Sequence, residues 1–235
     1  MDIKATSKQT RDALQLGIYR VINPFVKLLI RMGVTPNTVT TIGFLGNLAA
    51  AVVIVIAGYG AARTGTVDWS LVTWAGALII GFSLFDMLDG QVARLGGMSS
   101  TFGAMYDSVL DRYCELATLG GVAYYLIQTG SFAGAVIAFV ALTGSIMVSY
   151  VRARAEGLGL ECKIGFMQRP ERVVVTSVAT LATGITGQIS GYQPGADGFN
   201  PDMILVIAMT VIAIFANLTA IARINHCRKL LAGRK

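Results

Sequence analysis

Charged residues are scarce in this sequence. They make up 14% of the 235 residues, whereas they usually make up roughly 25% of a soluble domain. Hydrophobic residues account for 54% of the chain, and the mean hydropathy is positive. This composition excludes an ordinary soluble domain and indicates a chain that lies largely in apolar surroundings.

Cysteine and histidine are also scarce. The three cysteines, Cys114, Cys162 and Cys227, show no metal-ligand spacing. We expect no disulfide among them, because all three fall toward the side of the membrane that is assigned below to the reducing cytoplasm. The single histidine, His226, stands in a basic segment and is predicted to be a surface residue rather than a ligand.

Long apolar runs, in contrast, are abundant. A helix needs about 20 residues to cross a hydrocarbon core of about 30 Å, and six runs reach this length: 38–58, 71–93, 104–128, 132–153, 171–190 and 203–222. Only helices and closed barrels satisfy their backbone groups in lipid, and these runs are too long and too uniformly apolar for barrel strands. The sequence therefore predicts an all-α integral membrane protein with six transmembrane helices.

The N-terminal segment, residues 1–35, is basic, and its apolar positions recur at helical spacing. This pattern predicts an amphipathic juxtamembrane helix at the interface; a surface helix packed on the bundle is the alternative. Pro24 predicts a kink or break near Asn23, and we expect no cleavable signal peptide. Residues 36–225 would then form the six-helix domain, and 226–235 a basic tail.

Positive charge fixes the predicted orientation. If the N-terminus lies inside, every Lys and Arg except Arg63 falls on the inner side, so both termini are predicted to be cytoplasmic. The Gly- and Pro-rich stretch 187–202 becomes an outer loop, with Trp69, Trp74 and Tyr192 near the outer helix ends as an aromatic belt. No basic-aromatic module accompanies the net charge of +6, so no nucleic-acid partner is expected.

Two pairs of aspartates stand at the ends of two apolar runs. Asp86 and Asp89 are three residues apart, and Asp107 and Asp111 are four apart, so each pair shares one helix face. Residues 95–103 are predicted to make a tight antiparallel hairpin that brings all four carboxylates together near the cytoplasmic interface. Clustered carboxylates need a cation, and oxygen ligands favour magnesium, manganese or calcium over zinc. Helix-end acids in water would explain one pair but not both.

Small residues and one arginine accompany these aspartates. Gly90, Ala93 and Gly103 leave room for a substrate close to the backbone, and Arg94 suits a phosphate group. A metal, an arginine and space for a ligand favour phosphate chemistry over proton pumping.

The same stretch resembles the signature of the CDP-alcohol phosphotransferase family. The matching residues follow the pattern Asp86-x2-Asp89-Gly90-x2-Ala93-Arg94-x8-Gly103-x3-Asp107-x3-Asp111. The resemblance implies a six-helix membrane domain, usually a homodimer, with a Mg²⁺ or Mn²⁺ site that holds two ions in some members. It implies that the four aspartates hold the metal and that Asp111 is the general base.

The resemblance also implies a set of residues around the CDP group. The stretch TPNTVT at 35–40 is similar to the family's start of the first span, which adds two positions to those of the signature. The implied CDP-binding residues are Asn37, Thr40, Asp86, Asp89, Gly90, Ala93, Arg94, Gly103 and Asp107.

The segment 149–175 is unusually basic, and Pro170 is well placed in the first turn of a helix. Guanidinium groups near a helix start favour an anion. The segment resembles the inositol-phosphate-using branch of the family, the bacterial phosphatidylinositol phosphate synthases. That likeness implies an acceptor-phosphate pocket from Arg152, Arg172 and Arg223, with Arg154 and Arg169 as further candidates. Members of this branch tend to carry Lys in place of Arg152.

The predicted reaction transfers the phosphatidyl group of CDP-diacylglycerol to inositol 1-phosphate and releases CMP. Glycerol 3-phosphate or another alcohol as acceptor, and a CDP-ether lipid as donor, remain open. A metal-ion transporter is the remote alternative, since the acids lie at one interface and no inverted repeat is evident. A metal-stabilised scaffold would leave Asp111 without a use.

Overall fold

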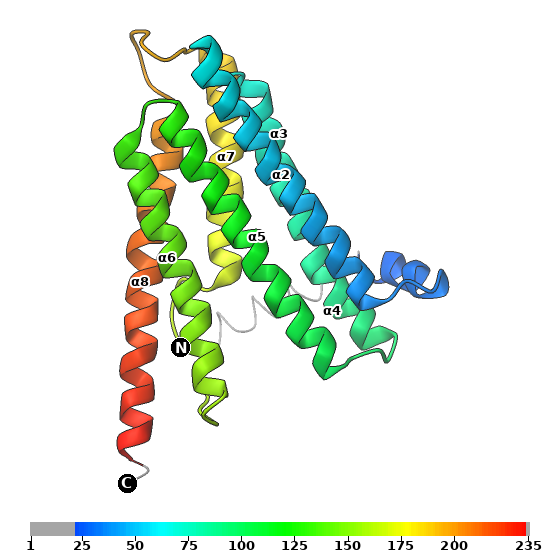
Figure 1. The fold of residues 1–235 in the computed structure, drawn as a ribbon. Helices are drawn as coiled ribbons and strands as arrows, with labels where there is room; N and C mark the ends of the chain where they lie inside the picture. Colours follow the sequence, from blue (N-terminus) through cyan, green and yellow to red (C-terminus); the bar gives the residue numbers. More distant parts are fainter. Residues whose placement is uncertain (1–21, 234–235) are drawn as a thin grey trace, which may run out of the picture. The chain divides into compact units, whose positions relative to one another are not determined.

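The structure, a computed structural model, describes residues 22–233 of the chain (Figure 1). Residues 22–31 are helical, with Pro24 in the first described turn. Most of the amphipathic helix predicted over residues 1–35 lies outside the described residues, and the kink predicted near Asn23 is not tested.

All regular secondary structure in residues 22–233 is helical, which confirms the predicted all-α class. After the helix at 22–31, the elements are α2 (Pro36–Thr64), α3 (Trp69–Ser83), α4 (Phe85–Leu95), α5 (Thr101–Gln128), α6 (Phe132–Glu156), α7 (Arg169–Ser190) and α8 (Asp202–Ala232).

Within the described residues, five segments are long and apolar enough to cross a membrane: α2, the α3–α4 segment Trp69–Leu95, α6, α7 and α8. The chain is therefore an integral membrane protein, but the predicted count of six spans is not confirmed. The third predicted span, 104–128, is helical within α5. Its first half carries Asp107, Asp111, Arg112 and Glu115, which lower the hydropathy of this helix.

The second predicted span, 71–93, is divided at Leu84 into α3 and α4. The sequence has no proline there to signal a break. The amides of Met87 and Leu88 both donate to the Leu84 carbonyl, at 3.0 and 3.2 Å, so the turn is tight where α4 begins. α4 then carries the first aspartate pair on a helix of its own.

The chain separates into two compact units. Unit 1 holds the described residues 22–43 together with 84–110, and unit 2 holds residues 44–83 together with 111–233. The small core of unit 1 consists of Val26, Val39, Leu88 and Val92. These residues join the helix at 22–31, the start of α2 and α4.

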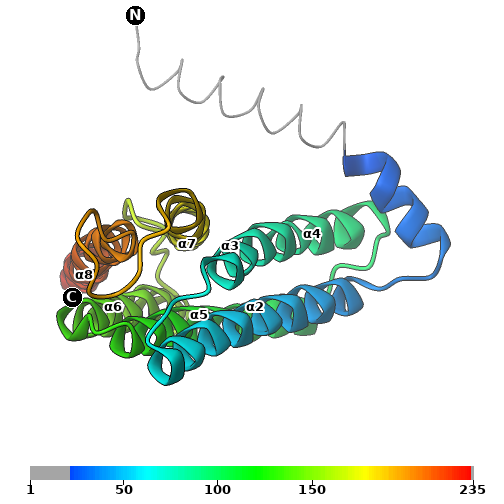
Figure 2. The same cartoon turned by 90° about the horizontal axis from the view of Figure 1, so that it is seen from above.

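Unit 2 has a larger apolar core, in which α3 packs on α7 and α6 packs on α8 (Figure 2). Glycine makes the first of these contacts close. A side chain at Gly76 would overlap the backbone of Leu181, and one at Gly184 would overlap Thr73. Small residues of this kind let membrane helices approach backbone to backbone.

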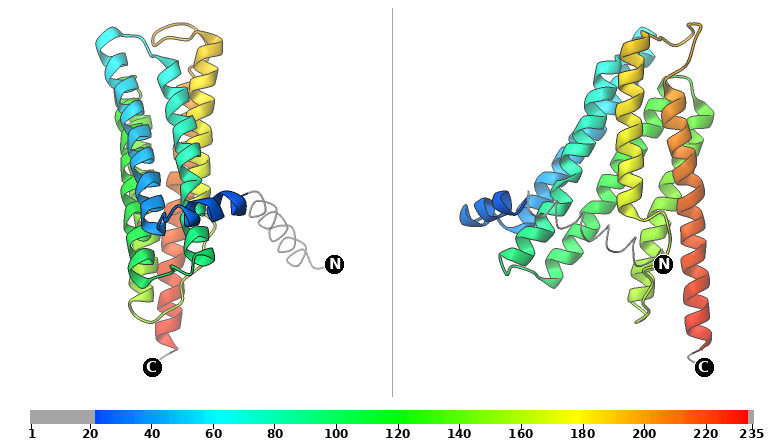
Figure 3. Two further views of the ribbon diagram at one scale, coloured as in Figure 1. Left: turned by 90° about the vertical axis from the view of Figure 1, so that its right-hand side faces the viewer. Right: turned by 180° about the vertical axis from the view of Figure 1, so that it is seen from behind.

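One end of unit 2 is closed by the α7–α8 connection, residues 191–201, which is shorter than the predicted outer loop 187–202 (Figure 3). The Gln193 side chain accepts a hydrogen bond from the Val67 amide, and the Trp69 indole donates to the Tyr192 carbonyl. Trp69 is only 5% exposed. Its ring packs in the core of unit 2, and the aromatic belt stays a prediction.

α8 continues well beyond the predicted end of its span at residue 222. It runs to Ala232, so most of the segment 226–235 that was assigned to a tail is helical. α7 begins at Arg169 with Pro170 in its first turn, as predicted.

Candidate functional site

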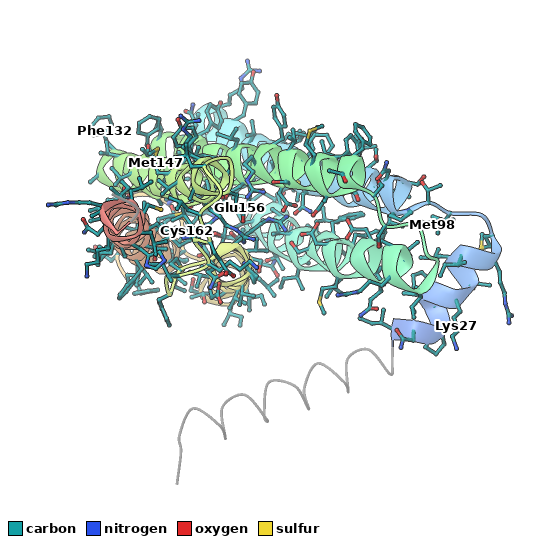
Figure 4. All side chains as sticks on the ribbon, turned by 90° about the horizontal axis from the view of Figure 1, so that it is seen from below. Lys27, Met98, Phe132, Met147, Glu156 and Cys162 are labelled. Carbon is teal, nitrogen blue, oxygen red and sulfur yellow. The ribbon has the colours of Figure 1, made fainter. Side chains whose placement is uncertain are left out.

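The α4–α5 hairpin of unit 1 is built by two local signals. Gly97 adopts a left-handed backbone, with φ 63°, and the Met98 amide donates to the Ala93 carbonyl at 2.9 Å, which ends α4. Ser100 caps α5, because its Oγ accepts a hydrogen bond from the Gly103 amide at 2.9 Å. Figure 4 labels Met98 in this turn. The hairpin predicted over residues 95–103 is confirmed.

The hairpin gathers three of the four aspartates. Asp86 and Asp89 on α4 and Asp107 on α5 each offer a carboxylate oxygen, and these oxygens lie within 4.8 Å of one another. Three carboxylates this close form the all-oxygen donor set that hard divalent cations prefer. The residues present therefore fit the divalent metal site that the sequence predicted.

Asp89 is the most enclosed of the three, with 7% exposure. Its Oδ2 accepts a hydrogen bond from Thr40 Oγ1 at 2.7 Å. Thr41, the next residue on α2, shares a hydrogen bond of 3.0 Å with the Tyr106 hydroxyl on α5. The start of α2 thus orients a metal-ligating candidate and is tied to both arms of the hairpin.

A cavity of about 290 Å³ lies beside the carboxylates in unit 1. Every residue predicted to surround CDP, except Asp86, lines it. The sequence did not single out the remaining lining residues, which belong to the α2 start and the hairpin turn: Pro36, Met98, Ser99, Ser100 and Ala104.

The two signature glycines border this cavity. A Cβ at Gly90 would stand 3.7 Å from Arg94 Nη2, an ordinary contact, so packing within the protein does not require glycine there. A Cβ at Gly103 would stand 3.0 Å from Ser100 Oγ and 3.3 Å from Asn37 Oδ1, which is tight. The open face at Gly90 is consistent with a ligand that passes close to the α4 backbone.

Asp111 lies four residues after Asp107 on the same helix, in the part of α5 that belongs to unit 2. Its Oδ1 is 2.6 Å from Arg169 Nη2, and its Oδ2 is 3.4 Å from Arg112 Nη1. The candidate base is therefore flanked by two guanidinium groups, one on its own helix and one at the start of α7.

One turn further along α5, Glu115 forms a buried bidentate ion pair with Arg172. Arg172 Nε donates to Glu115 Oε1 at 2.6 Å, and Arg172 Nη2 donates to Glu115 Oε2 at 3.1 Å. Arg172 Nη1 donates to the Met167 carbonyl at 3.0 Å. Arg172 is only 1% exposed. Glu115 was not among the predicted site residues, although it follows Asp111 by four residues and so continues the acidic face of α5.

Arg223 on α8 is likewise enclosed, at 2% exposure. Its Nε donates to the Ile164 carbonyl at 2.8 Å and its Nη1 to the Val148 carbonyl at 2.7 Å. Arg152 pairs with Glu156 one turn later, at 2.9 Å.

The charges of Arg152 and Arg172 both act on the Arg223 guanidinium. The three arginines predicted to bind an acceptor phosphate therefore gather in unit 2. Arg154 stands on a different face of α6 from Arg152, because two residues turn an α-helix by about 200°.

Fold and site together define a membrane protein with a carboxylate cluster that fits a divalent metal, beside a cavity. The model of the CDP-alcohol phosphatidyltransferase family matches residues 33–223. The chain belongs to this family.

Two relatives with assigned names show which members of the family this chain is similar to. The phosphatidylinositol phosphate synthase of Mycobacteroides abscessus is 30% identical over 210 residues, which cover 89% of this chain and 84% of that protein. The archaetidylinositol phosphate synthase of Methanothermobacter thermautotrophicus is 37% identical over 165 residues, which cover 70% of this chain and 74% of that protein.

The phosphatidylinositol phosphate synthase of Mycobacterium tuberculosis has a similar fold. Its crystal structure with CDP-DAG bound has a TM-score of 0.72 at 26% identity, covering 88% of this chain and 94% of that one. Its structure with manganese and citrate has a TM-score of 0.69, covering 87% of each chain.

Proposed function

We propose that this protein transfers the phosphatidyl group of CDP-diacylglycerol to a hydroxyl of inositol 1-phosphate, giving phosphatidylinositol phosphate and CMP. The observation that carries the proposal is the cavity in unit 1, where a cluster of three carboxylates meets the signature residues Gly90, Arg94 and Gly103. The names of the relatives support the choice of donor and acceptor.

Unit 1 supplies the donor site in this proposal. Asp86, Asp89 and Asp107 would hold the divalent ion, and we propose Mg²⁺ or Mn²⁺, with two ions bound. The metal would neutralise the pyrophosphate and the charge that develops on the departing CMP. Arg94 contacts a phosphate oxygen, and the open backbone at Gly90 admits the nucleotide.

Asp111 is the proposed general base. The acceptor hydroxyl oxygen attacks the diacylglycerol-linked phosphorus, and the bond from that phosphorus to the oxygen of CMP breaks. The hydroxyl proton passes to the Asp111 carboxylate. Its ion pair with Arg169 orients the carboxylate that accepts this proton.

The phosphate of the acceptor is proposed to lie near the arginines of unit 2. Arg152, Arg172 and Arg223 belong to unit 2, and Arg169 begins α7 three residues before Arg172. Arg172 and Arg223 are buried and held by protein partners. Arg152 and Arg169 also have ion-pair partners, Glu156 and Asp111, but their side chains keep 41% and 21% exposure, so they are the better placed of the four to meet a ligand. Such a surplus of guanidinium groups suits a phosphorylated acceptor and has no use with a neutral one.

We also propose that both termini and the active site face the cytoplasm. The distribution of Lys and Arg supports this orientation. In that arrangement the acyl chains of the donor remain in the bilayer while the nucleotide and the acceptor come from the aqueous side. A homodimer is proposed from family membership.

CMP release from purified protein in lipid bilayers tests the function. CDP-diacylglycerol, Mg²⁺ and one acceptor at a time would be supplied, with Asp111→Asn in parallel. Turnover with inositol 1-phosphate that is lost in the variant is the expected result. Turnover with glycerol 3-phosphate alone would overturn the proposed acceptor, and metal flux without CMP release would favour a transporter.

An ether-linked donor is the one alternative that a comparison favours, because the archaetidylinositol phosphate synthase is among the relatives. Replacing CDP-diacylglycerol by its CDP-archaeol counterpart in the same assay separates the two donors. A kcat/KM at least as high with the diacyl donor is the expected result.

A further inference from the structure

A groove of about 500 Å³ runs along unit 2 between the second half of α6 and the end of α8. Its wall is mostly apolar; the α6 residues in it run from Met147 to Ala155, and Leu158 and Leu160 follow in the segment after α6. On the α8 side it is lined by Ile224, Cys227 and Leu231. This volume lies within the range of roughly 300–1,000 Å³ that small-molecule and lipid sites occupy.

Two arginines interrupt the apolar wall. Arg154 projects from the last turn of α6, and Arg228 stands one residue after Cys227 on α8. Both are exposed, and among the described residues neither guanidinium forms an ion pair with a carboxylate. The groove lining contains no acidic residue. The groove therefore carries a net positive charge, because no lining residue offsets the two arginines.

The groove lies where α6 and α8 reach the face that carries the basic residues. Met147 and Arg154 are separated by seven residues, or about 10 Å along the helix. The lining that precedes the two arginines along α6 and α8 is apolar apart from the Tyr150 hydroxyl, and Leu158, Leu160 and Leu231 follow them. An apolar groove that carries two guanidinium groups matches an acyl chain joined to an anionic headgroup. Basic pockets between transmembrane helices on the cytoplasmic side are known to bind such headgroups.

We propose that this groove binds one anionic phospholipid of the surrounding membrane, with an acyl chain along the apolar wall and the phosphate between Arg154 and Arg228. The proposed ligand is separate from the donor at the carboxylates of unit 1, and the proposal does not depend on the reaction catalysed there. It assigns Arg154 to a lipid rather than to the acceptor.

The bound lipid would lie beside a structural junction. Cys162 lies in the segment after α6 and forms a small buried cluster with Leu160 of the same segment and Ala155 of α6. Cys227, which lines the groove, packs against this cluster. Figure 4 labels Met147 on α6 and Cys162 in the segment that follows it. Arg223, one turn before Cys227, holds the same segment through the Ile164 carbonyl. A lipid in the groove therefore covers one side of the cluster that anchors residues 157–168.

Cys227 provides a native reporter for occupancy. It is partly exposed, whereas Cys114 and Cys162 are buried. Burial also raises the pKa of the Cys162 thiol, and maleimides react with thiolates, so Cys162 is doubly protected. Labelling by N-ethylmaleimide should therefore occur first at Cys227, and peptide mass spectrometry identifies the site.

The experiment uses the full chain in nanodiscs of phosphatidylcholine alone or with added phosphatidylglycerol. Occupancy by phosphatidylglycerol slows labelling of Cys227 about tenfold when the lipid exceeds its dissociation constant about tenfold, because only the empty groove reacts. Arg154→Gln/Arg228→Gln should lose this protection, and Arg154→Lys/Arg228→Lys should retain most of it. Lys163→Gln, which removes a basic residue outside the groove lining, is the matched control and should keep it.

Each other outcome overturns the proposal. Equal labelling rates in the two membranes mean that no anionic lipid enters the groove. Protection that persists in the Gln double variant means that surface charge, and not the arginines, slows the reaction. Protection in phosphatidylcholine that depends on two copies per nanodisc means that a second copy of the chain covers the groove. Thermal unfolding in phosphatidylcholine shows that each variant is folded; if the double variant is not, Arg228→Gln and Arg228→Lys are compared.

Discussion

Arg169 Nη2 lies 2.6 Å from Asp111 Oδ1, so the first residue of α7 is ion-paired with the candidate base on α5. The carboxylate cannot be treated as a free helix-surface group, because its orientation depends on a residue 58 positions later in the chain. Arg169 keeps 21% of its side chain exposed, so the same guanidinium can still reach a ligand.

This relationship predicts different effects for the two members of the pair. Asp111→Asn should lower kcat about 10²–10⁴-fold, as expected when a general base is removed. Arg169→Gln should lower kcat about tenfold, and the double variant should be no slower than Asp111→Asn alone, since both act on one proton transfer. Steady-state CMP release measures both. Arg63→Gln, remote in sequence from both sites, is the control, and additive losses would contradict the coupling.

The second prediction concerns Glu115 and Arg172, whose ion pair is buried. Glu115→Ala leaves a buried guanidinium without its charged partner and should destabilise the protein by about 3–5 kcal/mol. Thermal unfolding of the purified protein in detergent would report this as a marked fall in Tm. The Tm of Glu115→Gln should fall less, because the Gln side chain keeps one acceptor oxygen for the Arg172 Nε.

A surface pair serves as the matched control. Glu161 and Lys163 are 3.4 Å apart with largely exposed side chains, so Glu161→Ala should cost about 0–1 kcal/mol. A similar Tm for Glu115→Ala and Glu161→Ala would show that the buried pair does not stabilise unit 2.

The aspartate hairpin could be predicted from the sequence because its signals are local. The 3- and 4-residue spacings place each pair on one helix face, and Gly97 and Ser100 end one helix and begin the next within the same few residues. The cavity lining followed from the signature for the same reason. The structure adds Ser99 and Ser100, which no charge or periodicity distinguished in advance.

The contacts that organise unit 2 could not be predicted, since they join distant segments. Glu115 and Arg172 are 57 residues apart, and Arg223 reaches carbonyl groups 59 and 75 residues away. Nothing in the sequence near Leu84 distinguishes a broken span from a continuous one. Trp69 is a residue type common at membrane interfaces, and its place in the core depends on residues distant in sequence, among them Gly187 and Tyr192.

The third prediction concerns the hydrogen bond from Thr40 to Asp89, of 2.7 Å. Thr40→Val keeps the shape of the side chain but removes the donor that orients the carboxylate. Loss of a group that orients a metal ligand typically costs about 10–100-fold in metal affinity. Titration with Mn²⁺, followed by its electron paramagnetic resonance signal, should show this loss. Thr38 is an exposed residue two positions earlier, so the Thr38→Val variant should bind Mn²⁺ as tightly as the parent protein does. Equal Mn²⁺ affinities for the Thr40→Val and Thr38→Val variants would contradict the role of Thr40.

The last prediction separates the space at Gly90 from ordinary helix energetics. A Cβ at Gly90 meets only Arg94 Nη2 at 3.7 Å, and a Cβ at Gly120 on α5 meets nothing within 4 Å. Both Gly→Ala changes lie within helices, so both should leave Tm unchanged or raise it, because Ala is favoured over Gly there by about 0.5–1 kcal/mol. Only Gly90→Ala places a methyl group in the 290 Å³ cavity, and it should raise the KM for CDP-diacylglycerol about tenfold. If Gly90→Ala and Gly120→Ala gave the same KM, the nucleotide would not pass close to the α4 backbone, and the donor would have to lie elsewhere in unit 1.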